Sequence, residues 1–127
     1  MTDATRSKIW SPLEGAFADV YQTLHSLVPG VKMQCGHHWN EAFAFWAYAE
    51  FSAGGRTVVI SFSVQANGDH FDIWGDVAKE DGYVLREVMR ATINGTSDGD
   101  DQFIDKSGEF ARRCKRETSA LIVKELM

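Results

Sequence analysis

The sequence lacks the features that mark exported or membrane-bound proteins. Its first residues, MTDATRSKIW, have neither the basic start of a signal peptide nor its apolar core of roughly 7–15 residues. No apolar run approaches the roughly 20 residues that span a bilayer. The chain has only two cysteines, Cys35 and Cys114, and without an export signal free thiols are favoured over a disulfide. These absences predict a cytoplasmic protein with no membrane association.

Catalytic motifs are missing as well. The sequence has no glycine-rich phosphate loop, no nucleophile elbow and no dinucleotide-binding fingerprint. The segment 98–101 resembles the start of a calcium loop, but the glutamate that closes such a loop is absent from its expected place. We therefore predict a non-enzymatic protein with no catalytic residues, no cofactor and no bound metal.

One short cluster, Cys35-Gly36-His37-His38, contains residue types that bind zinc. Its spacing matches no standard zinc site, which favours a surface loop with an incidental pair of histidines. The sequence leaves open whether Cys35, His37 and His38 join a site assembled from distant parts of the chain.

Charge is unbalanced and segregated. The formal net charge is -5 and the pI is near 5.3, which argues against a nucleic-acid partner because such domains usually present a basic field. Residues 67–81 hold five carboxylates and a single lysine. Basic residues instead cluster from Arg112 to Arg116, in a role that the sequence leaves open. The distribution predicts an electrically bipolar molecule.

Two helices are expected, one towards each end of the chain. Ser11-Pro12-Leu13-Glu14 predicts a helix start, because serine can cap, proline suits the first position and glutamate completes a capping box. Pro29-Gly30 ends that helix. A second apolar stripe at helical spacing begins at Gln102, with Gly108 as a candidate interruption.

Four consecutive strands are expected between residues 42 and 89. Segment 42–51 permits a helix, but its aromatic residues favour a strand. Val31 to Cys35 is a candidate short strand, followed by a loop from Gly36 to Asn40. The strands are separated by turn signals at Gly54-Gly55, Asn67-Gly68 and Asp81-Gly82. The predicted fold is a single α+β domain, residues 1–127, with a four-stranded antiparallel meander flanked by an N-terminal and a C-terminal helix.

The alternation of side chains suggests an interface on this sheet. It directs Phe71, Ile73 and Val77 inward and Asp72, Trp74 and Asp76 to the opposite face. Trp46, Tyr48 and Trp39 are further candidates for that face. Aromatic residues edged by carboxylates suit a protein interface, whereas a face covered by helices would make the tryptophans part of the core. The predicted partner-binding residues are Trp74, Asp69, Asp72, Asp76, Glu80 and Asp81.

An N-terminal helix, a meander containing Phe71-Asp72-Ile73-Trp74-Gly75-Asp76 and a C-terminal helix together resemble the small immunity proteins that neutralise bacterial polymorphic toxins. The resemblance implies a one-to-one inhibitor that blocks a toxin's active site, with the carboxylates of segment 67–81 competing with nucleic acid for a basic cleft. Phage-encoded inhibitors of host defence have the same physical profile. The predicted function is a small acidic protein-binding module with a basic protein partner. Its oligomeric state is not set by the sequence.

Two other functions stay open. A small-ligand-binding domain or small enzyme would need a pocket between sheet and helices, lined by Phe43, Phe45, Trp46, Phe62 and Trp74. A secretion chaperone would need a dimer with exposed apolar grooves.

Overall fold

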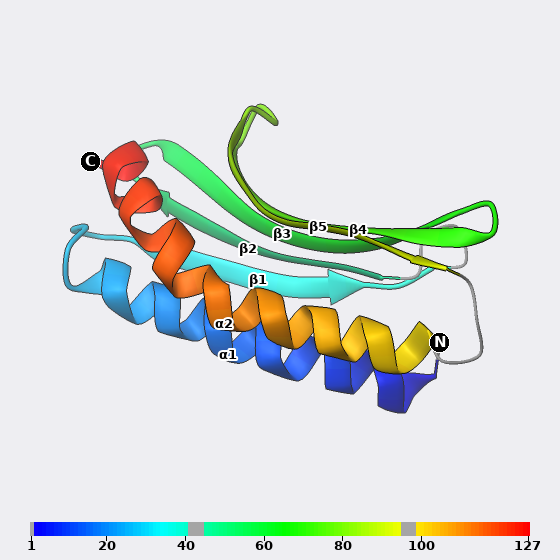
Figure 1. Ribbon diagram of the computed structural model, residues 1–127. Helices are drawn as coiled ribbons and strands as arrows, with labels where there is room; N and C mark the ends of the chain where they lie inside the picture. Colours follow the sequence, from blue (N-terminus) through cyan, green and yellow to red (C-terminus); the bar gives the residue numbers. More distant parts are fainter. Residues whose placement is uncertain (1, 41–44, 95–98) are drawn as a thin grey trace.

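An antiparallel five-stranded sheet forms one layer of the computed structural model, and two helices form the other (Figure 1). The structure describes residues 2–40, 45–94 and 99–127. The strands β1 (Lys32–His38), β2 (Phe45–Ala53), β3 (Arg56–Asn67), β4 (His70–Lys79) and β5 (Val84–Asn94) pair in chain order. The helices are α1 (Asp3–His25) and α2 (Gly99–Leu126). The predicted α+β class and the two flanking helices are confirmed, but the meander has five strands instead of four.

The fifth strand is β1, which continues to His38 although the sequence predicts a loop from Gly36 onward. Gly36 pairs with Tyr48 of β2, and a Cβ at residue 36 would lie 3.1 Å from the Tyr48 hydroxyl oxygen. An aromatic ring packed over a glycine on the neighbouring strand compensates for the missing side chain. His37 stacks on Phe45, with ring centroids 5.6 Å apart. The candidate strand at Val31 to Cys35 is thus confirmed from Lys32 onward, whereas its continuation to His38 depends on contacts with β2 that the local sequence does not reveal.

Helix α1 begins at Asp3, so the predicted helix start at Ser11 is wrong and Pro12 lies inside the helix. The actual cap is Thr2, whose hydroxyl accepts a 3.1 Å hydrogen bond from the Thr5 amide. The Thr5 hydroxyl in turn donates to Asp100 Oδ2 of α2, at 3.0 Å. This bond places the first turns of the two helices side by side.

The core lies between the sheet and the helices. Ile73 and Val77 are fully buried there, and Phe71 packs edge-on against Phe103 of α2, which confirms the predicted inward side of β4. Gly75 lies on the same side, where a Cβ would come within 2.5 Å of the Phe110 ring. Because Gly75 has no side chain, α2 can pack close to the sheet at this position.

Strand β5 is irregular. Its register with β4 shifts between Gly75 and Asp76 and again between Val77 and Ala78. Because a bulge breaks the alternation of side chains, the consecutive residues Val88 and Met89 are both buried. The strand extends to Asn94, beyond the predicted end at Met89.

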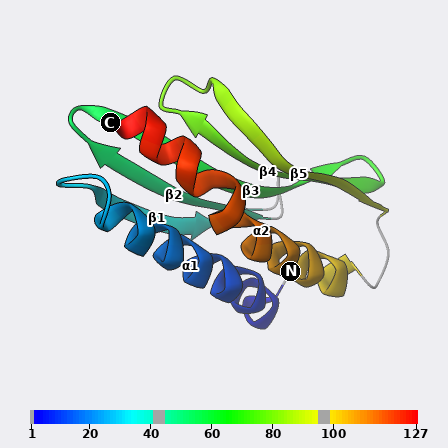
Figure 2. The same cartoon turned by 60° about the vertical axis from the view of Figure 1, so that its left-hand side comes forward.

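Both helices lie on the same side of the sheet (Figures 1 and 2). They start together, but the C-terminal part of α2 turns away from α1 and crosses over the sheet. Neither helix covers the opposite face of the strands. Among the described residues, no helix is both long enough and apolar enough to cross a bilayer.

Candidate functional site

The face of the sheet that points away from the helices, called the outer face below, is the candidate site. Strand pairing gives its layout in rows that run across the strands. One row consists of His38, Trp46, Ser63, Trp74 and Arg90. The next row consists of Gly36, Tyr48, Ser61, Asp76 and Glu87. On the central strand β3, the small Ser63 thus separates Trp46 from Trp74, and Ser61 separates Tyr48 from Asp76.

Three rings stack along β1 and β2. The Trp46 and Tyr48 centroids are 4.8 Å apart with an interplanar angle of 23°. His38 lies nearly parallel to both, with centroids 5.3 Å from Trp46 and 6.0 Å from Tyr48. Trp46 remains 36% exposed. The rings form an aromatic wall that solvent, or a partner, can reach.

Trp74 stands on the other side of β3. The guanidinium carbon of Arg90 lies 5.6 Å from its ring centroid, and Arg90 Nε lies 3.2 Å from Glu87 Oε1. Because neighbouring strands are about 4.8 Å apart, Trp46 and Trp74 are separated by roughly 10 Å at the backbone. Ser63 lies between them. The small polar Ser63 side chain therefore lies between two larger aromatic ones, an arrangement called the trough below.

Asp76 lies beside this trough and is half-buried. Burial raises the pKa of its carboxyl, and the nearby Glu87 carboxylate raises the pKa further. Within residues 2–40, 45–94 and 99–127, no hydrogen bond or ion pair satisfies this carboxylate. A cation placed against Asp76 would supply the missing stabilisation of its charged form.

Asp72 shares the outer face with Trp74 and Asp76, as predicted, but its carboxylate is already engaged. It accepts hydrogen bonds from Asn67 Nδ2 at 3.1 Å and from Thr92 Oγ1 at 3.2 Å. The Nε2 atom of His70 lies 3.7 Å away. Asp72 is therefore less available to a partner than Asp76.

The remaining predicted carboxylates lie at the two ends of β4. Asp69 is in the β3–β4 turn, whereas Glu80 and Asp81 are in the β4–β5 turn. Asp81 Oδ1 accepts a hydrogen bond from the Tyr83 amide, at 3.0 Å, which serves the turn. Since β4 has 10 residues, the turns are roughly 33 Å apart. The six predicted residues do not form one cluster, and their role in binding stays a prediction.

The residues from Cys35 to His38 lie in β1, so their side chains alternate between the two faces of the sheet. Cys35 and His37 point towards the helices, where His37 packs on Trp10 of α1 with centroids 4.7 Å apart. His38 points to the outer face. In the part of the chain that the structure describes, no three His, Cys, Asp or Glu residues are placed to hold a metal ion.

The residues proposed for a pocket between sheet and helices lie on opposite sides of the sheet. Phe45 and Phe62 are fully buried in the core, whereas Trp46 and Trp74 are on the outer face. Phe43 lies outside the described residues. These side chains therefore cannot line a single cavity. Trp39, a further candidate for the outer face, instead contacts Arg6 of α1. The guanidinium carbon of Arg6 lies 4.7 Å from the Trp39 ring centroid.

Sequence reasoning missed the residues that complete the outer face, namely Ser61, Ser63, Glu87 and Arg90. The alternation in β3 marks the two serines as outward. That Ser63 lies between Trp46 and Trp74, and Ser61 between Tyr48 and Asp76, follows only from the register of three strands.

Comparison with protein-family models, with curated proteins and with solved structures found no match to this chain.

Proposed function

We propose that the chain is a non-catalytic protein-binding domain whose outer face receives a basic side chain, above all an arginine, from a partner protein. The observation that carries the proposal is the half-buried Asp76 carboxylate, which has no partner among the described residues and lies next to Trp74.

Arginine matches this surface better than lysine does. Its planar guanidinium stacks on aromatic rings and forms paired hydrogen bonds with a carboxylate. The protein already contains a version of this arrangement, because Arg90 lies over Trp74 and pairs with Glu87. A guanidinium entering from the β3 side would find the trough, with Asp76 as its acceptor. The net charge of -5 would also attract a basic partner over longer distances.

In its narrower form, the proposal is that the domain is an inhibitor, such as a toxin-neutralising immunity protein or a phage-encoded anti-defence protein. Blocking a basic nuclease cleft requires a small acidic surface with rigid anchoring rings, and the outer face supplies both. The docked partner would then place a cleft arginine in the trough.

A direct test is titration with hexa-arginine, hexa-lysine and hexa-glutamate peptides, monitored by the NMR signal of the Trp74 indole N–H. We expect hexa-arginine to bind most tightly and hexa-glutamate not to bind. Asp76→Asn should weaken hexa-arginine binding by about tenfold or more, because hydrogen bonds to a charged group are lost.

The matched control is Asp19→Asn, which removes the same charge from an exposed position on α1. It should leave the affinity nearly unchanged. Equal losses in the two variants would show that only net charge matters, and the proposed site would be wrong.

The narrower form has a separate test. The chain is co-expressed in bacterial cells with the product of the gene next to its own, and growth is measured. An inhibitor should restore growth, and Asp76→Asn should restore it less well than Asp19→Asn. If the neighbouring product is harmless, or if both variants protect equally, the inhibitor role through this face is refuted, although peptide binding can still hold.

A further inference from the structure

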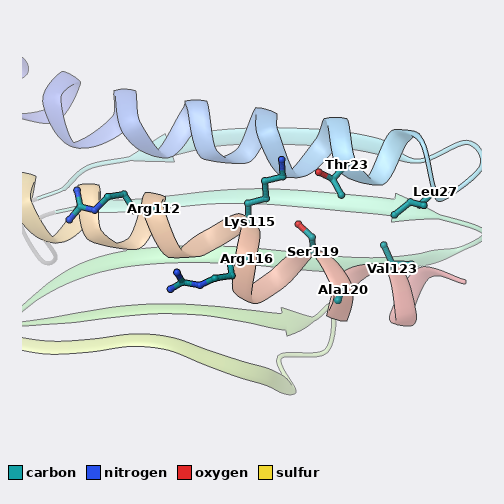
Figure 3. Close-up of a pocket in the computed structure, with 8 residues that line it drawn as sticks. All are labelled: Thr23, Leu27, Arg112, Lys115, Arg116, Ser119, Ala120 and Val123. Carbon is teal, nitrogen blue, oxygen red and sulfur yellow. The ribbon is translucent and has the colours of Figure 1, made fainter.

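A groove opens on the helix layer where the C-terminal part of α2 turns away from α1 (Figure 3). It has a volume of about 740 Å³, within the roughly 300–1,000 Å³ of typical small-ligand sites. The helices separate it from the outer face, so it is independent of the proposed protein-binding site.

The lining of the groove changes character along α2. Arg112, Lys115 and Arg116 line one end. The other end is lined by Leu27, which lies in the turn after α1, and by Ala120 and Val123 of α2 (Figure 3). Residues 112 and 123 are about 16 Å apart along the helix axis. Leu27 is 52% exposed, so its side chain is open to a ligand. The groove therefore has a cationic end and an apolar end.

The cations at the polar end are available. Within the described parts of the chain, Arg112 and Lys115 have no carboxylate within ion-pair distance. The adjacent Arg113 shows the contrast, because its Nε donates to Glu117 Oε2 at 2.6 Å. Two unpaired positive charges on one side of the groove favour an anionic group there.

A buried hydroxyl lies between the two ends. Ser119 is only 8% exposed, and its Oγ has no hydrogen-bond partner among the described residues. Figure 3 shows the hydroxyl on the side of α2 that faces α1. The other buried hydroxyls of this helix are satisfied, since Ser107 bonds to the Ile104 carbonyl and Thr118 to the Cys114 carbonyl. A buried donor without an acceptor is uncommon and calls for a ligand or water.

We propose that this groove binds a single-chain amphiphile with an anionic head group, such as a phosphate or carboxylate on an alkyl chain. The head group lies against Arg112 and Lys115 and accepts a hydrogen bond from Ser119. The chain covers Leu27, Ala120 and Val123. A simple anion would leave the apolar end uncovered, and a neutral amphiphile would leave the cations unpaired.

The test uses dodecyl phosphate below its micelle concentration, with calorimetry for affinity and amide NMR signals for location. We expect saturable binding that shifts the signals of Leu27, Ser119 and Ala120 and leaves the Trp74 indole signal in place. Inorganic phosphate, which lacks the chain, should bind at least about tenfold more weakly, as should dodecyltrimethylammonium, which carries the opposite charge.

Variants locate the head group and the hydroxyl. Lys115→Glu should weaken binding by about tenfold or more, whereas Lys124→Glu, the same charge change at an exposed position outside the groove, should have little effect. Ser119→Ala should weaken binding about threefold to tenfold while leaving the free protein equally or more stable, because it removes an unsatisfied hydroxyl.

Three outcomes would overturn the proposal. Equal effects of Lys115→Glu and Lys124→Glu would show that the binding depends on net charge alone. Signal shifts confined to other residues would place the ligand elsewhere. Association with phosphatidylglycerol vesicles, without binding of monomeric dodecyl phosphate, would identify a membrane-contact surface in place of a ligand site.

Discussion

At the scale of single residues, Gly75 shows how a missing side chain determines packing. It lies in the middle of β4 on the core side, and the Phe110 ring of α2 occupies the space that a Cβ would take. That ring also packs against Phe62 of β3, with centroids 5.5 Å apart. One glycine therefore sets the distance between the helix and two strands.

Gly75→Ala should lower the free energy of unfolding by about 1–3 kcal/mol, because an added methyl group overpacks the core. Gly15→Ala is the matched control, since nothing lies within 4 Å of a Cβ at this α1 position. It should raise stability by about 0.5–1 kcal/mol, as alanine favours helix. Urea denaturation measures both. If Gly75→Ala is as stable as the parent, the ring does not occupy the position described.

Asp76 is a second residue whose environment has a measurable consequence. Burial and Glu87 raise its pKa, so the folded state holds its proton more tightly than the unfolded chain does. The stabilisation that protonated Asp76 contributes is fully present at pH values below its ordinary pKa of 3.8. It is lost as the pH rises through the raised pKa of the folded state. At neutral pH the charged carboxylate therefore destabilises the fold.

Asp76→Asn should accordingly be more stable than the parent at pH 7 and nearly equal to it at acid pH below 3.8. The measurement is urea unfolding across this range, with Asp19→Asn as the control that should show no comparable trend. A gain that is the same at every pH would mean that ionisation is not its cause. A residue that lowers stability when charged, yet supports binding, fits the usual conflict between stability and function.

At the scale of elements, alternation and turn chemistry predict the last four strands well. The turns at Gly54-Gly55, Gly68 and Gly82 all have positive φ angles, between 59° and 92°, which only glycine adopts readily. Long-range contacts explain the failures. The part of β1 beyond Cys35 depends on pairing across Gly36, and the capping signal at Ser11 is overridden because Thr2 provides an earlier start.

Helix α1 therefore contains an interior proline, which has no N–H to donate to the Lys8 carbonyl. Pro12→Ala should restore this bond and raise the free energy of unfolding by about 1–3 kcal/mol. Pro29→Ala, beyond the end of the helix, should change stability by less than about 1 kcal/mol. Thermal and urea unfolding test both variants. A destabilised Pro12→Ala would show that the fold needs a bend at this position.

At the scale of the whole molecule, the two candidate surfaces differ in how far the sequence reveals them. Alternation is enough to place Trp74 and Asp76 on the outer face. The groove brings Leu27, just beyond the end of α1, next to residues of α2 almost 100 positions later, which depends on how the helices diverge. The basic cluster from Arg112 to Arg116 is visible in the sequence, but the apolar surface beside it is not.

The two surfaces lie on opposite layers, with the sheet and helix core between them (Figures 1 and 2). Charges separated by more than a Debye length, about 8 Å at about 0.15 M salt, interact weakly in solvent. The two binding reactions should therefore be nearly independent. Asp76→Asn should weaken hexa-arginine binding but leave the affinity for dodecyl phosphate within about twofold.

Lys115→Gln should show the reverse pattern, weakening only the binding of dodecyl phosphate. Calorimetry with each probe separately, at about 0.15 M salt, measures all four affinities without mixing the oppositely charged ligands. If either variant weakens both reactions by about tenfold, the surfaces are coupled through the core, since screened charge cannot account for such a change. Independence would instead mean that one small domain presents two separate sites, an acidic aromatic sheet face and a basic groove between its helices.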